Sequence, residues 1–243
     1  MKMKDRYLSY KIENGLNPRR FSDRVRLQGY LRSHLDDILA ENPKFTQGGL
    51  LSNRMTGKAL GFAYYDCVPT DFCRTRCYGL PIAGIHDYNM LRQGVLVSEF
   101  LRRHDGRFLD DLAAATRPCS HLKIGHWGDT TIEQVPALLD LARACAGTRF
   151  WWYTRKLEVA AAVNREKYGN LRAYLSLDPC TSYPSRRDYP FGFTYVFGDG
   201  MRHPCHVDIL ADDRLVAVFL LKKGRTIQDP DEVWIMEMIG KGP

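Results

Sequence analysis

Three cysteines close together are the most informative feature of this 243-residue sequence. Cys67, Cys73 and Cys77 lie in the segment CVPTDFCRTRCY, which is otherwise mostly polar. Thiolates are soft ligands that select zinc, copper(I) or iron–sulfur clusters, whereas hard ions prefer oxygen ligands. A buried free cysteine can also act as a small apolar side chain, which suits Cys145 on the apolar side of a predicted helix but not three cysteines in a polar loop. We therefore expect this loop to hold a metal centre.

The spacing of the three cysteines bears on which metal they hold. Zinc sites are usually built from two pairs of ligands, each pair separated by two to four residues, and no second pair of this kind follows the loop. Three cysteines on one loop after a first strand resemble instead the loop that binds a [4Fe–4S] cluster in radical-SAM barrels, where the spacing is shorter. We expect a [4Fe–4S] cluster, with Zn²⁺ as the alternative. S-adenosylmethionine would bind only if the likeness extended further, and no clear Gly-Gly-Glu segment follows.

The elements that must position this loop are clearest in the second half of the chain, where predicted strands and helices alternate. The predicted strands cover residues 121–125, 149–153, 171–177, 191–197 and 215–221, and the predicted helices lie between the first three of them, the second over 156–166. Strand–helix alternation at this spacing implies right-handed crossovers and a parallel sheet. The predicted fold is α/β, a partial (β/α) TIM-like barrel with mostly parallel strands.

The first half is less regular. Residues 1–49 are expected to form an irregular N-terminal extension with one helix over Asp23–Leu39, and residues 50–243 the barrel domain. A short aromatic strand is predicted over Gly61–Tyr65 and a helix from about 89 to 103. Thr130 and Glu133 have the spacing of a capping box at the start of the helix that follows strand 121–125.

Ligands of parallel α/β sheets and barrels bind on the loops that follow the carboxyl ends of the strands. Here those loops contain a set of polar residues that turn preferences alone explain poorly. We expect a cofactor or substrate to be bound by His126, Asp129, Thr154, Arg155, Ser176 and Asp178, with Lys156 as a further member. His126 is the only obvious acid or base for neutral pH among them; the catalytic residues are left unassigned.

The same argument about strand ends selects a fourth ligand for the metal. Cys119 precedes its strand and so lies at the opposite edge. Cys205 and Cys180 both follow strands, and Cys205 is flanked by His203 and His206. Cys205 is the preferred fourth ligand and Cys180 the second choice, while a histidine ligand would resemble a mixed site of raised potential.

Composition narrows the class of protein. Hydrophobic residues make up 44% and charged residues 26%, as in globular proteins, which excludes a disordered or fibrous chain. An odd number of cysteines without an export signal argues against a disulfide framework, and no apolar stretch reaches the ~18 residues of a membrane span. The net charge of +7 would favour nucleic acid as a partner, but the basic residues are scattered. We expect a cytoplasmic protein that does not bind membranes.

Four motifs in order resemble the phage gene product 88 domain family. They are Asn53–Lys58, the three-cysteine loop ending in Cys77-Tyr78, the strand end at Gly125–Asp129, and Tyr153-Thr154-Arg155, with Leu175–Asp178 also similar. The resemblance spans roughly residues 50 to 205. It implies a shortened relative of radical-SAM barrels, iron–sulfur binding and a location in the host cytoplasm. Arg54 stands where a Lys is expected, and a C-terminal cysteine cluster found in many members is missing.

Two classes of function follow. The first is a [4Fe–4S] protein with a redox or radical-type role at the cluster, acting on an unknown small molecule. The alternative is a non-catalytic protein whose metal, such as zinc, only stabilises the loop while the surface binds nucleic acid or a host protein. Iron and sulfide content and the ~400 nm absorbance of cysteine-ligated clusters would distinguish them.

Overall fold

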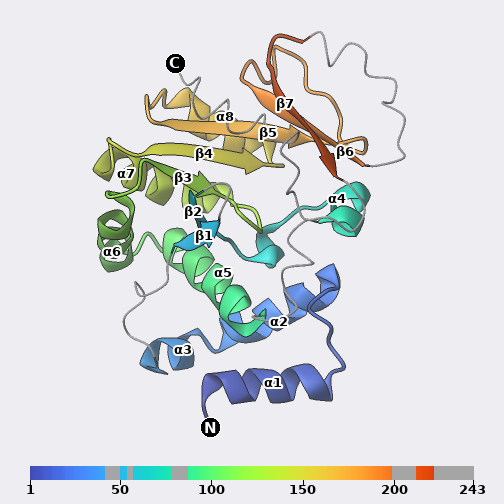
Figure 1. Cartoon of the computed structure of the whole chain (residues 1–243), viewed down its shortest axis with the longest axis vertical. Helices are drawn as coiled ribbons and strands as arrows, with labels where there is room; N and C mark the ends of the chain where they lie inside the picture. The colour runs from blue at the N-terminus through green and yellow to red at the C-terminus, as the bar shows by residue number, and fades with distance from the viewer. Residues whose placement is uncertain (42–49, 54–56, 78–86, 199–211, 222–243) are drawn as a thin grey trace.

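The structure is a computed structural model that describes residues 1–41, 50–53, 57–77, 87–198 and 212–221 (Figure 1). Its α-helices are α1 Met3–Glu13, α2 Phe21–Ser33, α3 Leu35–Glu41, α4 Asp71–Arg76, α5 Asp87–Arg102, α6 Gly106–Thr116, α7 Val135–Ala144 and α8 Leu157–Arg165. Two 3₁₀ helices, η1 Tyr64–Asp66 and η3 Ile132–Gln134, lie between them. The strands are β1 Leu51–Asn53, β2 Gly57–Leu60, β3 His121–Ile124, β4 Arg149–Thr154, β5 Leu171–Leu177, β6 Phe193–Gly198 and β7 Leu215–Leu221. None of the described helices has the length and apolar character needed to cross a membrane.

The seven strands form one sheet whose spatial order is the order of the chain, β1 to β7. β1 pairs antiparallel with β2, and every later pair is parallel. The mixed α/β class and the parallel sheet predicted from the sequence are therefore confirmed. Within the described residues the sheet does not close on itself.

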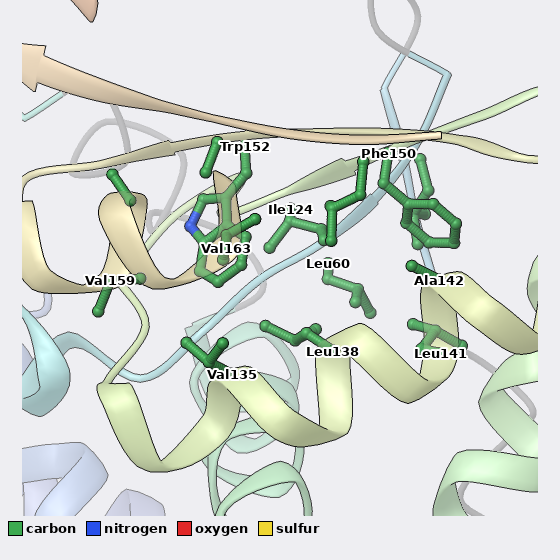
Figure 2. Close-up of a cluster of buried hydrophobic side chains, with 14 of the residues drawn as sticks. Leu60, Ile124, Val135, Leu138, Leu141, Ala142, Phe150, Trp152, Val159 and Val163 are labelled. Carbon is green, nitrogen blue, oxygen red and sulfur yellow. The ribbon is translucent and has the colours of Figure 1, made fainter. Parts of the chain in front are cut away.

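Helices cover one face of the sheet and bury its apolar side chains. Leu60, Ile124, Phe150 and Trp152 point from β2, β3 and β4 toward α7 and α8, as Figure 2 shows. The helices contribute to this core Val97 and Leu101 of α5, Phe108 and Leu112 of α6, Leu138 and Leu141 of α7, and Val159 and Val163 of α8. Successive side chains of a strand point to opposite faces, so residues at intervening positions lie on the other face. That second face, which we call the polar face, carries Lys123 of β3, Trp151 and Tyr153 of β4, Tyr174 and Ser176 of β5, and Thr194 of β6.

The N-terminal segment is more regular than predicted. It contains α1, α2 and α3, and the single helix expected over 23–39 is divided at His34, whose φ of −119° and ψ of 29° are not helical. These helices share a second core with η1 and α5, including Leu27, Leu31 and Leu91. The buried Arg24 side chain donates to the Tyr64 hydroxyl and, at 2.8 Å, to the Pro18 carbonyl. Through these contacts, residues from the beginning of the chain pack directly against the turn that precedes the cysteine loop.

The prediction of an aromatic strand over residues 61–65 is wrong. The strand ends earlier, at Leu60, and the aromatic residues lead into the 3₁₀ turn η1. Phe62 and Tyr64 are buried by distant parts of the chain: the Phe62 amide donates to the Trp127 carbonyl at 2.8 Å, and the Tyr64 amide donates to Gln28 Oε1 at 2.5 Å. Hydrophobicity at these positions therefore reflects tertiary burial rather than pairing in a strand.

Other boundaries differ by a residue or two. The capping box lies one position later than predicted, at Thr131 and Gln134, and Gln134 Oε1 accepts the Thr131 amide at 2.9 Å. β6 begins at Phe193 rather than 191, and α6 was not predicted. The predictions over 89–103, 121–125, 149–153, 156–166, 171–177 and 215–221 are confirmed to within two residues by α5, β3, β4, α8, β5 and β7.

Candidate metal centre

The cysteine loop begins directly after η1 and includes the short helix α4. Cys67 is the first residue beyond η1, Cys73 lies within α4, and Cys77 follows its last turn. Thr70 is the N-cap of α4, and its hydroxyl accepts the Cys73 amide at 3.0 Å. An N-cap of this kind satisfies one of the free amides of the first turn and fixes the start of the helix. The local sequence thus sets the positions of Thr70 and Cys73 relative to each other.

A buried carboxylate attaches this loop to the sheet. The Thr70 hydroxyl donates to Asp178 Oδ2 at 2.5 Å, and the Arg155 guanidinium donates to the same oxygen. Asp178 is fully buried, and its Oδ1 accepts the Cys180 amide at 2.9 Å and the Thr181 hydroxyl at 2.8 Å. Because Arg155 and Asp178 follow β4 and β5, α4 lies beside the carboxyl ends of the strands (Figure 1).

Lys156 makes a second attachment. Its Nζ donates to the Asp66 carbonyl at 2.6 Å, immediately before Cys67. The Asp66 carboxylate accepts Arg102 at 2.6 Å and Gln134 at 3.1 Å, which links η1 to α5 and η3. Burial raises the pKa of Asp66, and the positive charge of Arg102 opposes that shift. The turn before Cys67 is therefore held at two points of Asp66: its backbone carbonyl, by Lys156, and its side-chain carboxylate, by Arg102 and Gln134.

Asp129 lies between these attachments. It is buried, and its carboxylate accepts the Thr130 amide at 2.8 Å and the Arg155 amide at 3.1 Å, with a further side-chain hydrogen bond from Thr154. Burial raises the pKa of Asp129, while these hydrogen bonds and the charge of Lys156 lower it. This carboxylate orients the backbone at the end of β4, and with it the Arg155 side chain.

The three thiols influence one another. The pKa of Cys67 is raised well above its usual value: burial is the largest cause, and the charges of Asp129, Cys77 and Cys73 add to it. Burial raises the pKa of Cys73 to about 11, although Arg155 acts in the opposite direction. Cys67 and Cys77 also pack against the N-terminal core, so the loop is enclosed rather than extended into solvent. The cysteines are therefore close enough to interact electrostatically. Among the described residues, however, no three His, Cys, Asp or Glu side chains lie close enough together to hold a metal ion.

The structure brings together four of the residues predicted at the strand ends: Asp129, Thr154, Arg155 and Asp178. Ser176 lies two residues before Asp178, on the polar face. Cys119 lies before β3, as predicted, and Cys180 is exposed beside Asp178. The preferred fourth ligand, Cys205, lies outside the described residues, as do His203 and His206.

His126 is held in the loop after β3 rather than in the network around Asp178. Its amide donates to the Leu60 carbonyl at 2.7 Å, and burial lowers the pKa of the ring to about 4, with the nearby charge of Lys123 adding to the effect. The turn that follows depends on Gly128, whose φ is +72° and where a Cβ would come within 2.3 Å of the Phe62 carbonyl oxygen. Because its pKa is lowered to about 4, His126 is a neutral imidazole at pH 7.

Three contributors were not identified from the sequence. Thr70 and Asp66 lie in or next to the cysteine segment, so their polar side chains were visible, but their partners are far away in the chain. Lys123 is a charged residue in the middle of an apolar strand, and this departure from the strand pattern was the available signal.

The likeness to a family noted from the motifs can be compared with the whole chain. The family model for gene product 88 matches residues 31–188, which include the cysteine loop and the polar ends of β3, β4 and β5. A search of the curated proteins found no match. The matched segment is well over half of the sequence and contains Cys67, Cys73 and Cys77 together with Asp178. The chain therefore belongs to the gene product 88 family.

Proposed function

We propose that this protein binds a [4Fe–4S] cluster through Cys67, Cys73 and Cys77 and has a redox or radical-type role with a small-molecule substrate. The observation that carries the proposal is the attachment of the three-cysteine loop to the carboxyl end of the sheet through Thr70, Asp178 and Arg155. In parallel α/β folds this edge is where ligands bind. A loop held in this way presents its thiols to a ligand at the sheet edge.

The chemistry of the donors supports a soft metal centre. Burial and the neighbouring thiols raise the pKa of Cys67 and of Cys73, so these two thiols release protons when a cation binds, since the cation stabilises their charged forms. Arg155 and Lys156 place positive charge beside them, which offsets the negative charge of a thiolate-bound centre. When bound, a [4Fe–4S] cluster supplies one-electron chemistry.

The remaining residues position and protect the centre. Arg155 holds the loop through Asp178 and lowers the pKa of Cys73, which favours its thiolate. Asp129 fixes the Arg155 backbone, and Lys156 holds the turn before Cys67. Cys180 is the described candidate for a fourth ligand, and Cys205 remains the preferred one from the sequence. We also infer that the sheet is part of a partial (β/α) barrel related to radical-SAM barrels, and that the protein acts in the cytoplasm of a phage-infected host.

The test is metal analysis of protein purified without oxygen. We expect about four iron and four sulfide per chain and a broad absorbance near ~400 nm. Cys73→Ser should lose most of the iron, sulfide and colour. Cys119→Ser is the matched control, because it replaces another half-buried cysteine, at the amino end of β3, and should keep them.

Two results would overturn the proposal. A colourless protein with one zinc per chain would support the alternative of a zinc-stabilised protein that binds nucleic acid or a host protein without catalysis. Equal iron content in the Cys73→Ser and Cys119→Ser variants would show that the iron is bound elsewhere.

A further inference from the structure

A cavity of about 360 Å³ lies beside the first half of β5. The residues that line it come from the end of α8 and the turn after it, from β5, and from the segment just before β6; they include Asn164, Lys167, Arg172, Tyr174, Phe191 and Gly192. These positions are at the amino end of β5, whereas the cysteine loop is attached at the carboxyl ends of the strands. The cavity is therefore separate from the candidate metal centre.

The cavity exists because β6 begins late. Its first residue, Phe193, is paired with Leu175, so no described strand lies beside the preceding part of β5 on that side. Asn164 takes the place of such a strand: its Nδ2 donates to the Ala173 carbonyl at 2.6 Å, and its Oδ1 accepts the Ala173 amide at 3.1 Å. These two bonds satisfy the backbone at the strand edge without a neighbouring strand. The space that the strand would fill is left open.

Two cations line the cavity, and none of the described residues around it is Asp or Glu. Arg172 is held in place because its Nη1 donates to the Tyr168 carbonyl at 2.5 Å and to the Leu171 carbonyl at 3.0 Å. Both of these bonds use Nη1, so the other guanidinium nitrogens can donate to a ligand. Lys167, which is exposed, adds an ammonium group. A guanidinium and an ammonium without a carboxylate in the same cavity favour an oxyanion as the ligand group.

The backbone at Lys167 is unusual for a lysine. Its φ of 55° lies in the left-handed region, and the residue comes directly after the C-cap of α8. Helices commonly end with a glycine in this conformation, because a Cβ is disfavoured there. The chain therefore has a lysine side chain beside the cavity at a position where glycine would be more stable.

Two aromatic rings form the apolar part of the cavity. Tyr174 packs against Gly192, where an added Cβ would lie 3.3 Å from two carbons of the ring. Phe191 makes an edge-on contact with Tyr189, with ring centres 5.5 Å apart, and the Tyr189 hydroxyl donates to the Gly192 carbonyl at 3.0 Å. Both rings are thus positioned by their neighbours. Aromatic side chains favour other rings in offset-stacked or edge-on contact, so they suit a ligand that contains a ring.

We propose that this cavity binds a small aromatic anion, a single ring that carries a carboxylate or phosphate group. The oxyanion accepts hydrogen bonds from Arg172 and Lys167, and the ring packs against Phe191 and Tyr174. Sites for small molecules span about 300–1,000 Å³. A cavity of about 360 Å³ is near the lower end of that range, which suits one ring rather than a large cofactor.

The probes are benzoate and phenyl phosphate, titrated separately into the full chain by calorimetry at constant ionic strength. Acetate and inorganic phosphate are the corresponding ions without a ring. We expect saturable binding with a Kd below about 1 mM for at least one aromatic probe, about tenfold or more tighter than its ring-free counterpart. The tighter aromatic probe shows which oxyanion the ligand carries. No saturable binding of either aromatic probe, or equal affinity for the aromatic probe and its ring-free counterpart, would overturn the proposal.

Lys167→Gly separates binding from folding. It removes the ammonium group at a left-handed position that glycine prefers, so the Tm should equal or exceed that of the original protein while the Kd rises about fivefold or more. Arg165→Gln is the matched control: it removes one exposed positive charge from the last turn of α8, outside the cavity lining, and should bind as the original protein does. Unchanged affinity in Lys167→Gly, or the same loss of affinity in both variants, would contradict the proposal.

Phe191→Leu tests the contribution of the ring, because it keeps an apolar side chain and removes only the aromatic contact. We expect the tighter aromatic probe to bind about three- to tenfold more weakly, with no change for its ring-free counterpart. Phe21→Leu is the control, since Phe21 is also half-buried but lies in α2. Equal affinity of the original protein and Phe191→Leu for the aromatic probe would show that the ring binds elsewhere. None of the probes requires iron, so this proposal and the iron–sulfur proposal fail independently.

Discussion

Replacing Asp178 by Asn tests the attachment of the cysteine loop most directly. The substitution keeps the shape of the side chain and removes its charge. Asp178 accepts two donors at each oxygen: Arg155 and Thr70 at Oδ2, and Cys180 and Thr181 at Oδ1. An amide has one oxygen and two N–H donors, so either pair of donors then faces another donor.

The size of the effect follows from burial. The Asp178 side chain is fully buried and that of Arg155 is 16% exposed, so the guanidinium cannot replace its partner with water. Breaking a buried ion pair by removing one charge costs about 3–5 kcal/mol. For a chain of this length each kcal/mol lowers the Tm by about 2–4 °C, so we expect a fall of roughly 6–20 °C.

Asp140→Asn is a control with the same chemical change. Asp140 also has two side-chain partners, His104 at 2.8 Å and Arg143 at 2.5 Å, but its side chain is 42% exposed. Exposed ion pairs contribute about 0–1 kcal/mol, so its Tm should fall by less than about 4 °C. The Tm values of both variants and of the original protein are measured by calorimetry at pH 7, each in its metal-free form. Equal shifts in the two variants would refute the argument that burial gives the Asp178 pair its strength.

Two other changes probe the loop after β3. Gly128→Ala should lower the free energy of unfolding, measured by urea titration, by at least about 2 kcal/mol, because alanine is strained at positive φ and its Cβ would meet the Phe62 carbonyl oxygen. The control is Gly147→Ala, which should have little effect because nothing lies within 4 Å of the added Cβ. The pKa of His126 is about 4 in the folded protein, against 6.5 for a histidine in the unfolded chain. The unfolded state therefore binds this proton more readily, and the free energy of unfolding falls by roughly 2–4 kcal/mol as the pH decreases from 6.5 to 4. The slope of urea stability against pH in this range should become shallower in His126→Gln, and an unchanged slope would show that His126 does not set it.

The parallel strands could be predicted because their side chains carry a local pattern. β4 and β5 are short, rich in aromatic and aliphatic residues, and bounded by polar turns, and both were predicted to within one residue. The strand-end rule then placed Asp129, Arg155 and Asp178 at one edge, and the structure joins them by hydrogen bonds. Local pattern and a general rule of topology were sufficient there.

Predictions failed where distant contacts decide the local structure. Phe62 and Tyr64 read as strand residues, but Gln28, Arg24 and Trp127 bury them in a turn. The link from Thr70 to Asp178 spans 108 residues of sequence, so no local pattern could reveal it. The polar face was missed for the same reason, because its members come from four strands and only Lys123 departs visibly from the expected alternation.

The strictly consecutive strand order has a consequence for how the molecule is made. Each strand from β2 onward adds to the edge formed by the strand synthesised just before it, so no later segment has to be inserted between earlier ones. From β3 onward each strand is joined to its neighbour by a short stretch of chain, which favours rapid closure, whereas residues 61–120 separate β2 from β3. Growth of the sheet can follow the direction of translation on the ribosome, and a nascent chain that ends after β5 already holds most of the helix-covered core, with Tyr189, Phe193 and Tyr195 of that core still to be added.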